Sequence, residues 1–145
     1  MKNLLLLFFA VFFILVTGGF GSSSGEKDKN IVLKIDNAAL SVQWEDNKSV
    51  DALKEILQGG YKIIDMHRYG GFEQVGNIGQ TLMSDNRQIT TSPGDIVLYS
   101  GNQIVIFYGS NSWSYTKLGR ITGKTDSELK TILDKAYVTL RISLE

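Results

Sequence analysis

Cysteine is absent from the 145-residue chain, and histidine occurs only once, as His67. The lack of cysteine excludes disulfide bonds and thiol catalysis, and with a single histidine it also excludes a zinc site built from these two residue types. Charge of one sign is missing too, because 15 basic residues balance 15 acidic ones and neither kind forms a block. Nucleic acid is therefore not expected as a partner. Without disulfides, the domain depends on its hydrophobic core for stability.

A long apolar run occurs only at the N-terminus, from Leu4 to Val16, after a single lysine. It is shorter than the stretch of about 20 apolar residues that a membrane-spanning helix needs. A basic start, a short apolar run and small residues after it are typical of a secretory signal peptide, which we predict over residues 1–21. Cleavage after Gly21 leaves glycine at both positions that the peptidase reads. The alternative is an uncleaved anchor extending to Phe20, and this is the only membrane association expected.

The N-terminal pattern predicts an extracytoplasmic protein, either secreted or periplasmic. Residues 22–30, SSSGEKDKN, are small and charged, and we interpret them as a flexible lead-in. Residues 31–145 suit one domain with a substantial core. No internal repeat is visible, and we expect a monomer.

Alternation of apolar and polar residues with a period of two dominates this domain. It predicts β-strands at residues 31–35, 40–45 and 138–144. Two further apolar runs, 96–99 and 104–108, flank a tight turn at residues 100–102 and predict a β-hairpin. Because these two runs are apolar on both faces, we expect them to lie inside the fold.

Two segments carry the signals of helices. Ser49 is predicted to cap a helix over residues 50–57, which two glycines then end. Thr125 and Glu128 form a capping-box pattern at the start of a second helix over residues 126–136. Together with the strands, these segments predict a mainly β fold with two helices, in which a closed β-barrel has its open ends covered by the helices.

Polar side chains in the segment 61–79 are candidates for a site. Alternation places Arg68 on the same face as Ile64 and Met66, and His67 on the opposite face. Arg68 is either an edge arginine reaching water or a fixed guanidinium at a pocket rim, where it can hold a carbonyl group. We interpret His67 as structural, because no nucleophile motif accompanies it. No glycine spacing fits a phosphate-binding loop, and no cofactor is expected.

Aromatic residues also occur in a polar stretch, GSNSWSYT, at residues 109–116. Its polar character predicts a loop in which Asn111, Trp113 and Tyr115 are partly exposed, because buried Trp and Tyr need partners for their N–H and O–H groups. Such aromatic residues are typical of a ligand platform and equally of the rim of a barrel.

The stretch PGDIVLYSGNQIVIFYG, followed shortly by WSYTKLGRI, resembles the small bacterial cyclophilin-like domains. These are reduced relatives of the cyclophilin peptidyl-prolyl isomerases. The resemblance covers about residues 31–145 and includes SVDALKEIL and YGGFEQVG. It implies a cyclophilin-like closed β-barrel. Val105 stands where cyclophilins place an aromatic pocket wall, and Tyr115 stands where they place a histidine.

The resemblance also implies a set of site residues. The pair His67–Arg68 is similar to the His-Arg of the cyclophilin catalytic strand, and it is followed by Phe72 and Gln74 before a glycine, at a shorter spacing. Gly101–Asn102–Gln103 resembles the Gly-x-Gln of the next pocket strand. By this comparison Arg68 is the catalytic residue if the protein is active. The ligand-binding residues are Phe72, Gln74, Gln103, Val105, Trp113 and Tyr115.

Three interpretations follow for function. The first is a secreted binding module for a peptide or small molecule, with little isomerase activity because Val105 and Tyr115 narrow the proline slot. The second is an extracytoplasmic peptidyl-prolyl cis-trans isomerase in which Arg68 is the hydrogen-bond donor. The third is a domain whose cleft serves only packing. In the first two, we expect five residues to line one concave site at a barrel rim: Arg68, Phe72, Gln74, Gln103 and Trp113.

Overall fold

The computed structural model describes residues 29–145, so the predicted signal peptide and nearly all of the predicted lead-in lie outside the described residues. The helices are α1 (Lys48–Leu57) and α2 (Asp126–Leu133). The strands are β1 (Ile31–Ile35), β2 (Ala38–Leu40), β3 (Val42–Trp44), β4 (Tyr61–Tyr69), β5 (Glu73–Asn77), β6 (Arg87–Thr90), β7 (Asp95–Tyr99), β8 (Gln103–Phe107), β9 (Ser112–Ile121) and β10 (Tyr137–Leu144).

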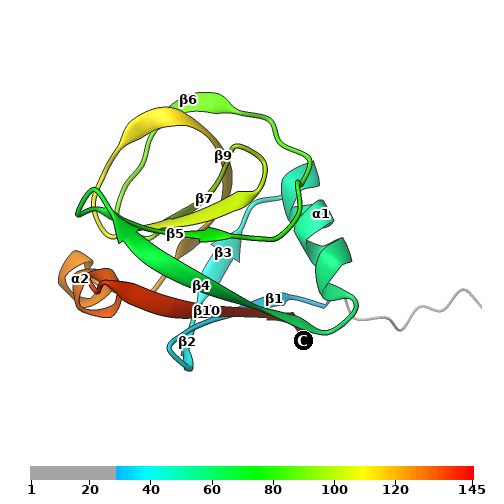
Figure 1. Cartoon of the computed structure of the whole chain (residues 1–145), viewed down its shortest axis with the longest axis horizontal. Helices are drawn as coiled ribbons and strands as arrows, with labels where there is room; N and C mark the ends of the chain where they lie inside the picture. The colour runs from blue at the N-terminus through cyan, green and yellow to red at the C-terminus, as the bar shows by residue number, and fades with distance from the viewer. Residues whose placement is uncertain (1–28) are drawn as a thin grey trace, which may run out of the picture.

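These strands form a nearly closed antiparallel barrel (Figure 1). The hydrogen-bonded order is β2-β1-β10-β4-β5-β8-β7-β9-β3, and β6 pairs with β9 beside this path. The open seam lies between the edge strands β2 and β3, and Trp44 of β3 links this edge to β1, because its indole Nε1 donates a hydrogen bond to the carbonyl oxygen of Ile31 at 3.0 Å. The prediction of a mainly β, cyclophilin-like barrel with two helices is confirmed.

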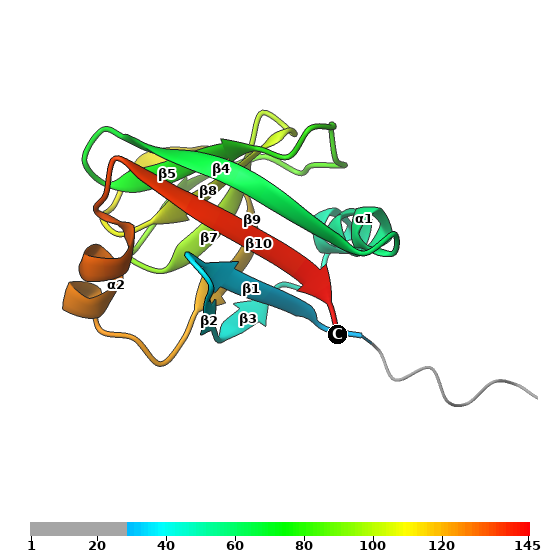
Figure 2. The same ribbon diagram turned by 60° about the horizontal axis from the view of Figure 1, so that its bottom comes forward.

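The two helices lie at opposite ends of the barrel, as Figures 1 and 2 show from two directions. Helix α1 buries Val50, Leu53 and Leu57, and helix α2 buries Leu129 and Leu133. Both sets join the interior core of the barrel. Each helix therefore covers an end of the barrel with its apolar side.

The helix ends differ in part from the sequence prediction. Asn47, and not Ser49, caps α1, because its side-chain oxygen accepts from the backbone N–H of Val50 at 2.9 Å. Ser49 is buried and donates to the carbonyl oxygen of Met83 instead. The Thr125 cap of α2 is confirmed. That helix ends at Leu133, three residues earlier than predicted, where a side chain from β5 holds its C-terminal carbonyl groups.

Two strand predictions also need adjustment. The strand predicted at 40–45 is divided into β2 and β3 by a break at Ser41. Trp113 and Tyr115 lie in β9 and not in a loop. The extension of β9 over these residues could not be predicted from local pattern, because the backbone partner of this polar part of β9 is β6, a short exposed strand that lacks an apolar pattern.

The hairpin of β7 and β8 has both of its faces covered, as predicted. Ile96, Leu98, Ile104 and Ile106 face the interior and belong to the main core. Their neighbours along the chain face outward and form a second apolar cluster, which Phe72, Ile89 and Tyr99 partly cover. The outward cluster consists of Val75, Val97, Val105, Phe107 and Tyr115.

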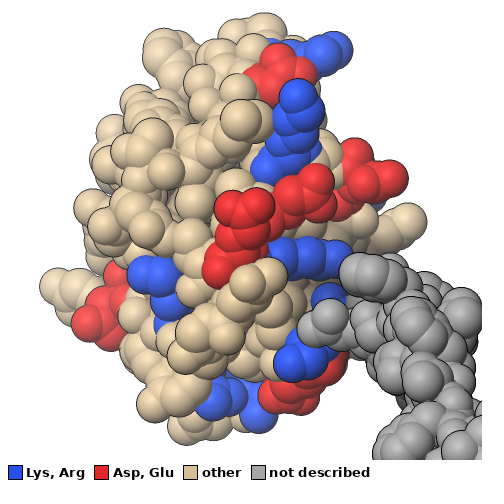
Figure 3. All heavy atoms as spheres, turned by 90° about the vertical axis from the view of Figure 1, so that its right-hand side faces the viewer, with Lys and Arg blue, Asp and Glu red and all other residues tan. Residues whose placement is uncertain are grey.

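The outer surface carries charges of both signs. On the face that holds α1, Lys and Arg lie side by side with Asp and Glu, so this face presents no large field of one sign (Figure 3). Within residues 29–145, neither helix has the length and apolar character that crossing a membrane requires.

Candidate functional site

A cleft of about 560 Å³ opens on the outer face of the barrel, above the second apolar cluster. Strands β4, β5, β7, β8 and β9, together with the loop before β9, supply its walls. The lining residues are His67, Tyr69, Glu73, Val75, Tyr99, Gln103, Val105, Asn111, Trp113 and Tyr115. The volume lies within the range of about 300–1,000 Å³ that is usual for small-ligand sites.

Strand register explains why these side chains meet. His67 pairs with Val75, and Val75 pairs in turn with Val105, so these three side chains stand on one face of three adjacent strands. In the next row Tyr69 pairs with Glu73. Because side chains alternate across a strand, the same alternation that fills the barrel with isoleucine and leucine sends this second set outward.

Glu73 is the most unusual residue of the cleft. Its side chain is only 6% exposed, and its Oε2 has no hydrogen-bond partner among the described residues. It stands between Tyr69 on β4 and Phe107 on β8. Burial raises the pKa of the Glu73 carboxyl from 4.5 to about 7. A buried carboxyl without a partner destabilises a fold, so its presence at the wall of an open cleft points to a function.

Tyr115 forms a fixed wall of the cleft. Its ring packs edge-on against Phe107, with centroids 5.7 Å apart, and against Tyr99 at 6.1 Å. Its hydroxyl oxygen accepts a hydrogen bond from the side-chain amide of Asn111 at 2.8 Å. Burial, more than any other cause, raises the pKa of this hydroxyl. Trp113, in contrast, is 55% exposed and offers a free aromatic face at the rim.

Arg68 does not line this cleft. It does share a face with Ile64 and Met66, as alternation predicted, but that face is the interior of the barrel. At the end of β4 its guanidinium leaves the barrel and pairs with the carboxylate of Asp134, just after α2, at 3.0 Å. The expectation that Arg68 shares the concavity with Trp113 is therefore wrong. Among the ten residues that line the cleft there is no arginine or lysine.

Gln74 and Phe72 are also placed elsewhere. Gln74 is fully buried and points to the barrel end, where its Nε2 donates to the carbonyl oxygens of Leu133 and Lys135 at 2.8 and 2.6 Å. Its predicted place in the cleft is wrong, because it is one residue out of phase with Glu73. Phe72 stacks parallel to Phe107 and supports the floor from the side. Four of the candidates do line the cleft: Gln103, Val105, Trp113 and Tyr115.

The sequence analysis missed His67, Tyr69, Glu73 and Tyr99 as cleft residues. His67 is exposed and, in the part of the chain that the structure describes, its side chain makes no hydrogen bond, which does not fit its interpretation as a structural histidine. A signal for Glu73 did exist. In the sequence FEQVG, Glu73 alternates with Gln74 and is in phase with Val75, which predicts that the glutamate and the valine share a face.

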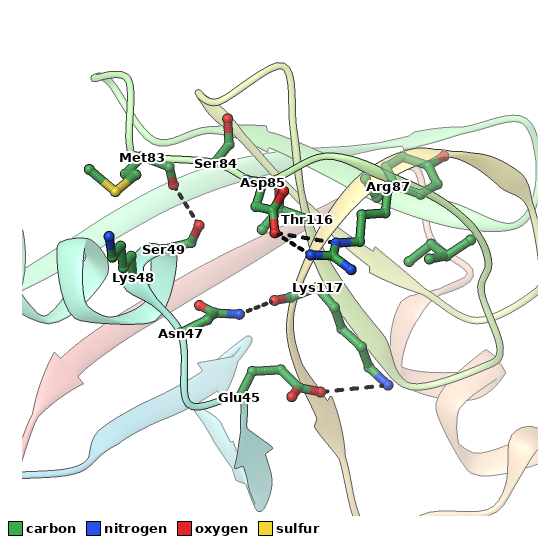
Figure 4. Close-up of a pocket in the computed structure, with 12 residues that line it drawn as sticks. Glu45, Asn47, Lys48, Ser49, Met83, Ser84, Asp85, Arg87, Thr116 and Lys117 are labelled. Atoms are coloured by element: carbon green, nitrogen blue, oxygen red, sulfur yellow. Dashed lines mark hydrogen bonds and ion pairs between the residues drawn. The ribbon is translucent and has the colours of Figure 1, made fainter.

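A second cavity, of about 720 Å³, lies between the loop before α1 and the segment 83–87 (Figure 4). Tyr115 lines both cavities. Here the polar groups bind one another: the Asn47 amide donates to the carbonyl oxygen of Lys117 at 2.9 Å, and Asp85 pairs with Arg87 at 3.0 Å. Because these groups are satisfied, this cavity is a weaker candidate than the smaller cleft.

The chemistry available in the cleft is that of recognition. Gln103 and Trp113 can donate hydrogen bonds, Glu73 can accept them, and Val75 and Val105 form an apolar floor. Across residues 29–145, no three side chains of the metal-binding types (His, Cys, Asp, Glu) come together. The arrangement suits a ligand with an apolar body and a few polar groups.

Comparison with known proteins gives one match. A family model described as the cyclophilin-like family matches residues 33–145, which is nearly all of the described chain. Among the curated proteins compared with the sequence, none matches it.

Proposed function

Since this chain belongs to the cyclophilin-like family, we propose that it is a binding module that holds a peptide or a small molecule in the outer-face cleft. The observation that carries this proposal is the buried, unpartnered Glu73 carboxyl at the wall of an open cleft. A leucine at this position would extend the apolar cluster and add stability. The glutamate is therefore better explained by a bound partner than by packing.

Isomerase activity is the alternative, and the cleft offers less for it than for binding. Isomerisation requires better binding of the twisted peptide bond than of either planar form, which a strong donor to the prolyl group provides. The guanidinium expected in that role belongs to Arg68, which is paired with Asp134 at the barrel end. The floor of Val75 and Val105 beside Gln103 supports docking of a proline ring without this donor. We therefore expect little turnover.

Trp113→Ala is expected to weaken ligand binding by about tenfold or more, because it removes a free aromatic face that a ligand in the cleft can contact. Arg68→Ala is expected to leave binding within about twofold, because its side chain does not line the cleft. NMR titration of the exported protein with a set of proline-containing and proline-free peptides measures both effects, and exchange spectroscopy on the same samples reports isomerisation.

The matched control for Trp113 is Tyr137→Ala, since Tyr137 is another exposed aromatic, 77% exposed, on β10 outside the cleft. Its loss is expected to leave binding unchanged. Robust isomerisation that disappears in Arg68→Ala would establish the isomerase interpretation in place of ours. Equal losses of binding in the Trp113 and Tyr137 variants would argue against the cleft.

We also propose that the protein works outside the cytoplasm, after cleavage of residues 1–21. The support is the sequence pattern of one lysine, a short apolar run and small residues. Mass spectrometry of the exported protein is expected to find an N-terminus at about Ser22. An intact N-terminus in the membrane fraction would show the anchored alternative to be correct.

A further inference from the structure

The character of the cleft narrows the class of ligand, and the inference drawn here rests on the proposed binding function. We infer that the ligand presents a positively charged nitrogen group, an ammonium or a guanidinium, to the carboxylate of Glu73. The apolar floor and the cleft shape define only the general character of the ligand, and this positive group makes it specific. Three features of the described residues carry it: the buried Glu73 carboxyl without a hydrogen-bond partner at Oε2, the absence of lysine and arginine from the cleft lining, and the aromatic walls.

The carboxyl group of Glu73 can accept a hydrogen bond that the protein itself does not donate. Glu73 is only 6% exposed, and its Oε2 has no hydrogen-bond donor in the part of the chain that the structure describes. A carboxylate in such a place gains most from a charge-assisted hydrogen bond, which is about twice as strong as a neutral one.

No cation of the described chain occupies this position. The ten cleft-lining residues include neither lysine nor arginine. The basic residue nearest in the sequence, Arg68, is engaged with Asp134 at 3.0 Å. In the described residues, Glu73 forms no ion pair with a lysine or an arginine, and its Oε2 has no hydrogen-bond partner. A positive group of a ligand would supply the partner that the protein does not provide.

The aromatic walls of the cleft suit a cationic group as well as the apolar body of a ligand. Tyr69 and Trp113 are 62% and 55% exposed, so their ring faces are free to contact a ligand. Tyr99 and Tyr115 stand on the other strands of the same cleft. Cations bind over the faces of such rings, with tryptophan the best of them, and aromatic rings beside a carboxylate are a usual arrangement for recognising ammonium groups.

The pH dependence distinguishes this inference from the opposite hydrogen-bond polarity. In the free protein burial raises the pKa of Glu73 to about 7, so a cation that requires the carboxylate binds more tightly as the pH rises from 5.5 to 8. A ligand carbonyl that accepts from the protonated acid shows the reverse trend.

Other groups that titrate or carry charge also face Glu73. They come from the strands that line the cleft: β4 supplies His67 and Tyr69, β7 supplies Tyr99, and β9 supplies Tyr115. The hydroxyl of Tyr108, which follows β8, has a pKa raised mainly by burial and by Asp134, and Glu73 adds a smaller contribution. Because His67 lines the same cleft, the titration is repeated with His67→Gln.

The test uses three probes of similar length, each an amino acid acetylated on its α-amino group and amidated on its carboxyl group: lysine, arginine and the neutral norleucine. The side chains of lysine and arginine keep their positive charge. NMR titrations of the exported protein at pH 5.5 and pH 8 give the affinities. At pH 8 we expect the lysine or arginine probe to bind about 10- to 100-fold more tightly than norleucine, as the gain from a charged hydrogen bond implies. Glu73→Gln is expected to remove this preference, and lowering the pH is expected to reduce it.

The control variant is Asp65→Asn, which removes the same charge from an exposed position on β4 outside the cleft lining. It is expected to keep the preference. Equal affinities for lysine, arginine and norleucine, or a preference that survives Glu73→Gln, would overturn the inference and leave cleft binding intact. If neither the three probes nor the peptide set shifts any cleft resonance, both the inference and the proposed function are overturned.

Discussion

Replacing Ile106 by alanine is expected to lower the free energy of unfolding by about 2–5 kcal/mol, the range for a buried aliphatic side chain that leaves a cavity. Ile106 has no exposed surface and lies in the main core. It stands in β8 between Ile96 of β7 and Gln74 of β5, so three strands are in contact at this point. Ile104→Ala is expected to have an effect of the same size, since Ile104 is equally buried.

Chemical denaturation measures both effects, and Ile63→Ala is the matched control. Ile63 is 52% exposed on β4, so its loss is expected to change the free energy of unfolding by less than about 1 kcal/mol. Losses below about 1 kcal/mol for both Ile104 and Ile106, well under the range for buried aliphatics, would contradict the assignment of this hairpin to the core.

Glu73→Gln is expected to stabilise the protein at pH 8 by about 3 kcal/mol, because a difference of one in pKa corresponds to about 1.4 kcal/mol. The pKa of Glu73 is raised by burial from 4.5 to about 7. Between these two values the folded state binds more protons than the unfolded state. The contribution of Glu73 to stability therefore falls as the pH rises from about 4.5 to about 7, and it stays low above that.

The measurement is a set of urea denaturations between pH 4 and pH 8.5 on the wild type and the variant. The difference between the two curves isolates Glu73 from the other titrating groups. It is expected to be near zero at pH 4 and to reach its full value by pH 8. The Asp65→Asn variant is expected to follow the wild type, since Asp65 is exposed. A loss of stability in Glu73→Gln at pH 8 would show that the carboxylate has a stabilising partner in the fold.

Much of the fold follows from local patterns. Strand β1 begins and ends at the predicted residues, and the hairpin of β7 and β8 turns at Ser100 and Gly101, which both have positive φ angles. Such angles suit the short turn that the sequence indicated. The strand β6 could not be predicted, because its residues are exposed and it is held by backbone pairing with β9 alone. Pairing between distant segments leaves no local hydrophobic pattern.

The site was predicted less well than the fold, and the reason lies in the barrel. Period-two alternation divides the side chains of β4 into two sets, but it does not say which set faces the interior and which faces a cleft. Arg68 belongs to the same set as Ile64 and Met66, which face the interior, so its side chain starts on the interior face. The cleft then belongs to the other set, which holds His67. For β5 the same phase sends Gln74 inward and Glu73 outward.

Residues after the hairpin were placed better, because the phase there is fixed by the turn. Gln103 opens β8 directly after the turn, and Val105 follows on the same face. Both line the cleft together with Trp113 and Tyr115, as the resemblance implied. The resemblance thus pointed to the region of the barrel where the cleft lies, while the local alternation of β4 and β5 decides which of their side chains line that cleft.

The most direct test of this account is the position of a bound ligand on the barrel. Backbone and indole resonances of the ¹⁵N-labelled protein are followed by NMR during titration with a peptide that binds. We predict that the largest shifts cluster at Glu73, Val75, Gln103, Val105 and the Trp113 indole, which all belong to the cleft. Shifts centred on Arg68 and Asp134 at the barrel end, or on Asn47 and Arg87 in the second cavity, would contradict it.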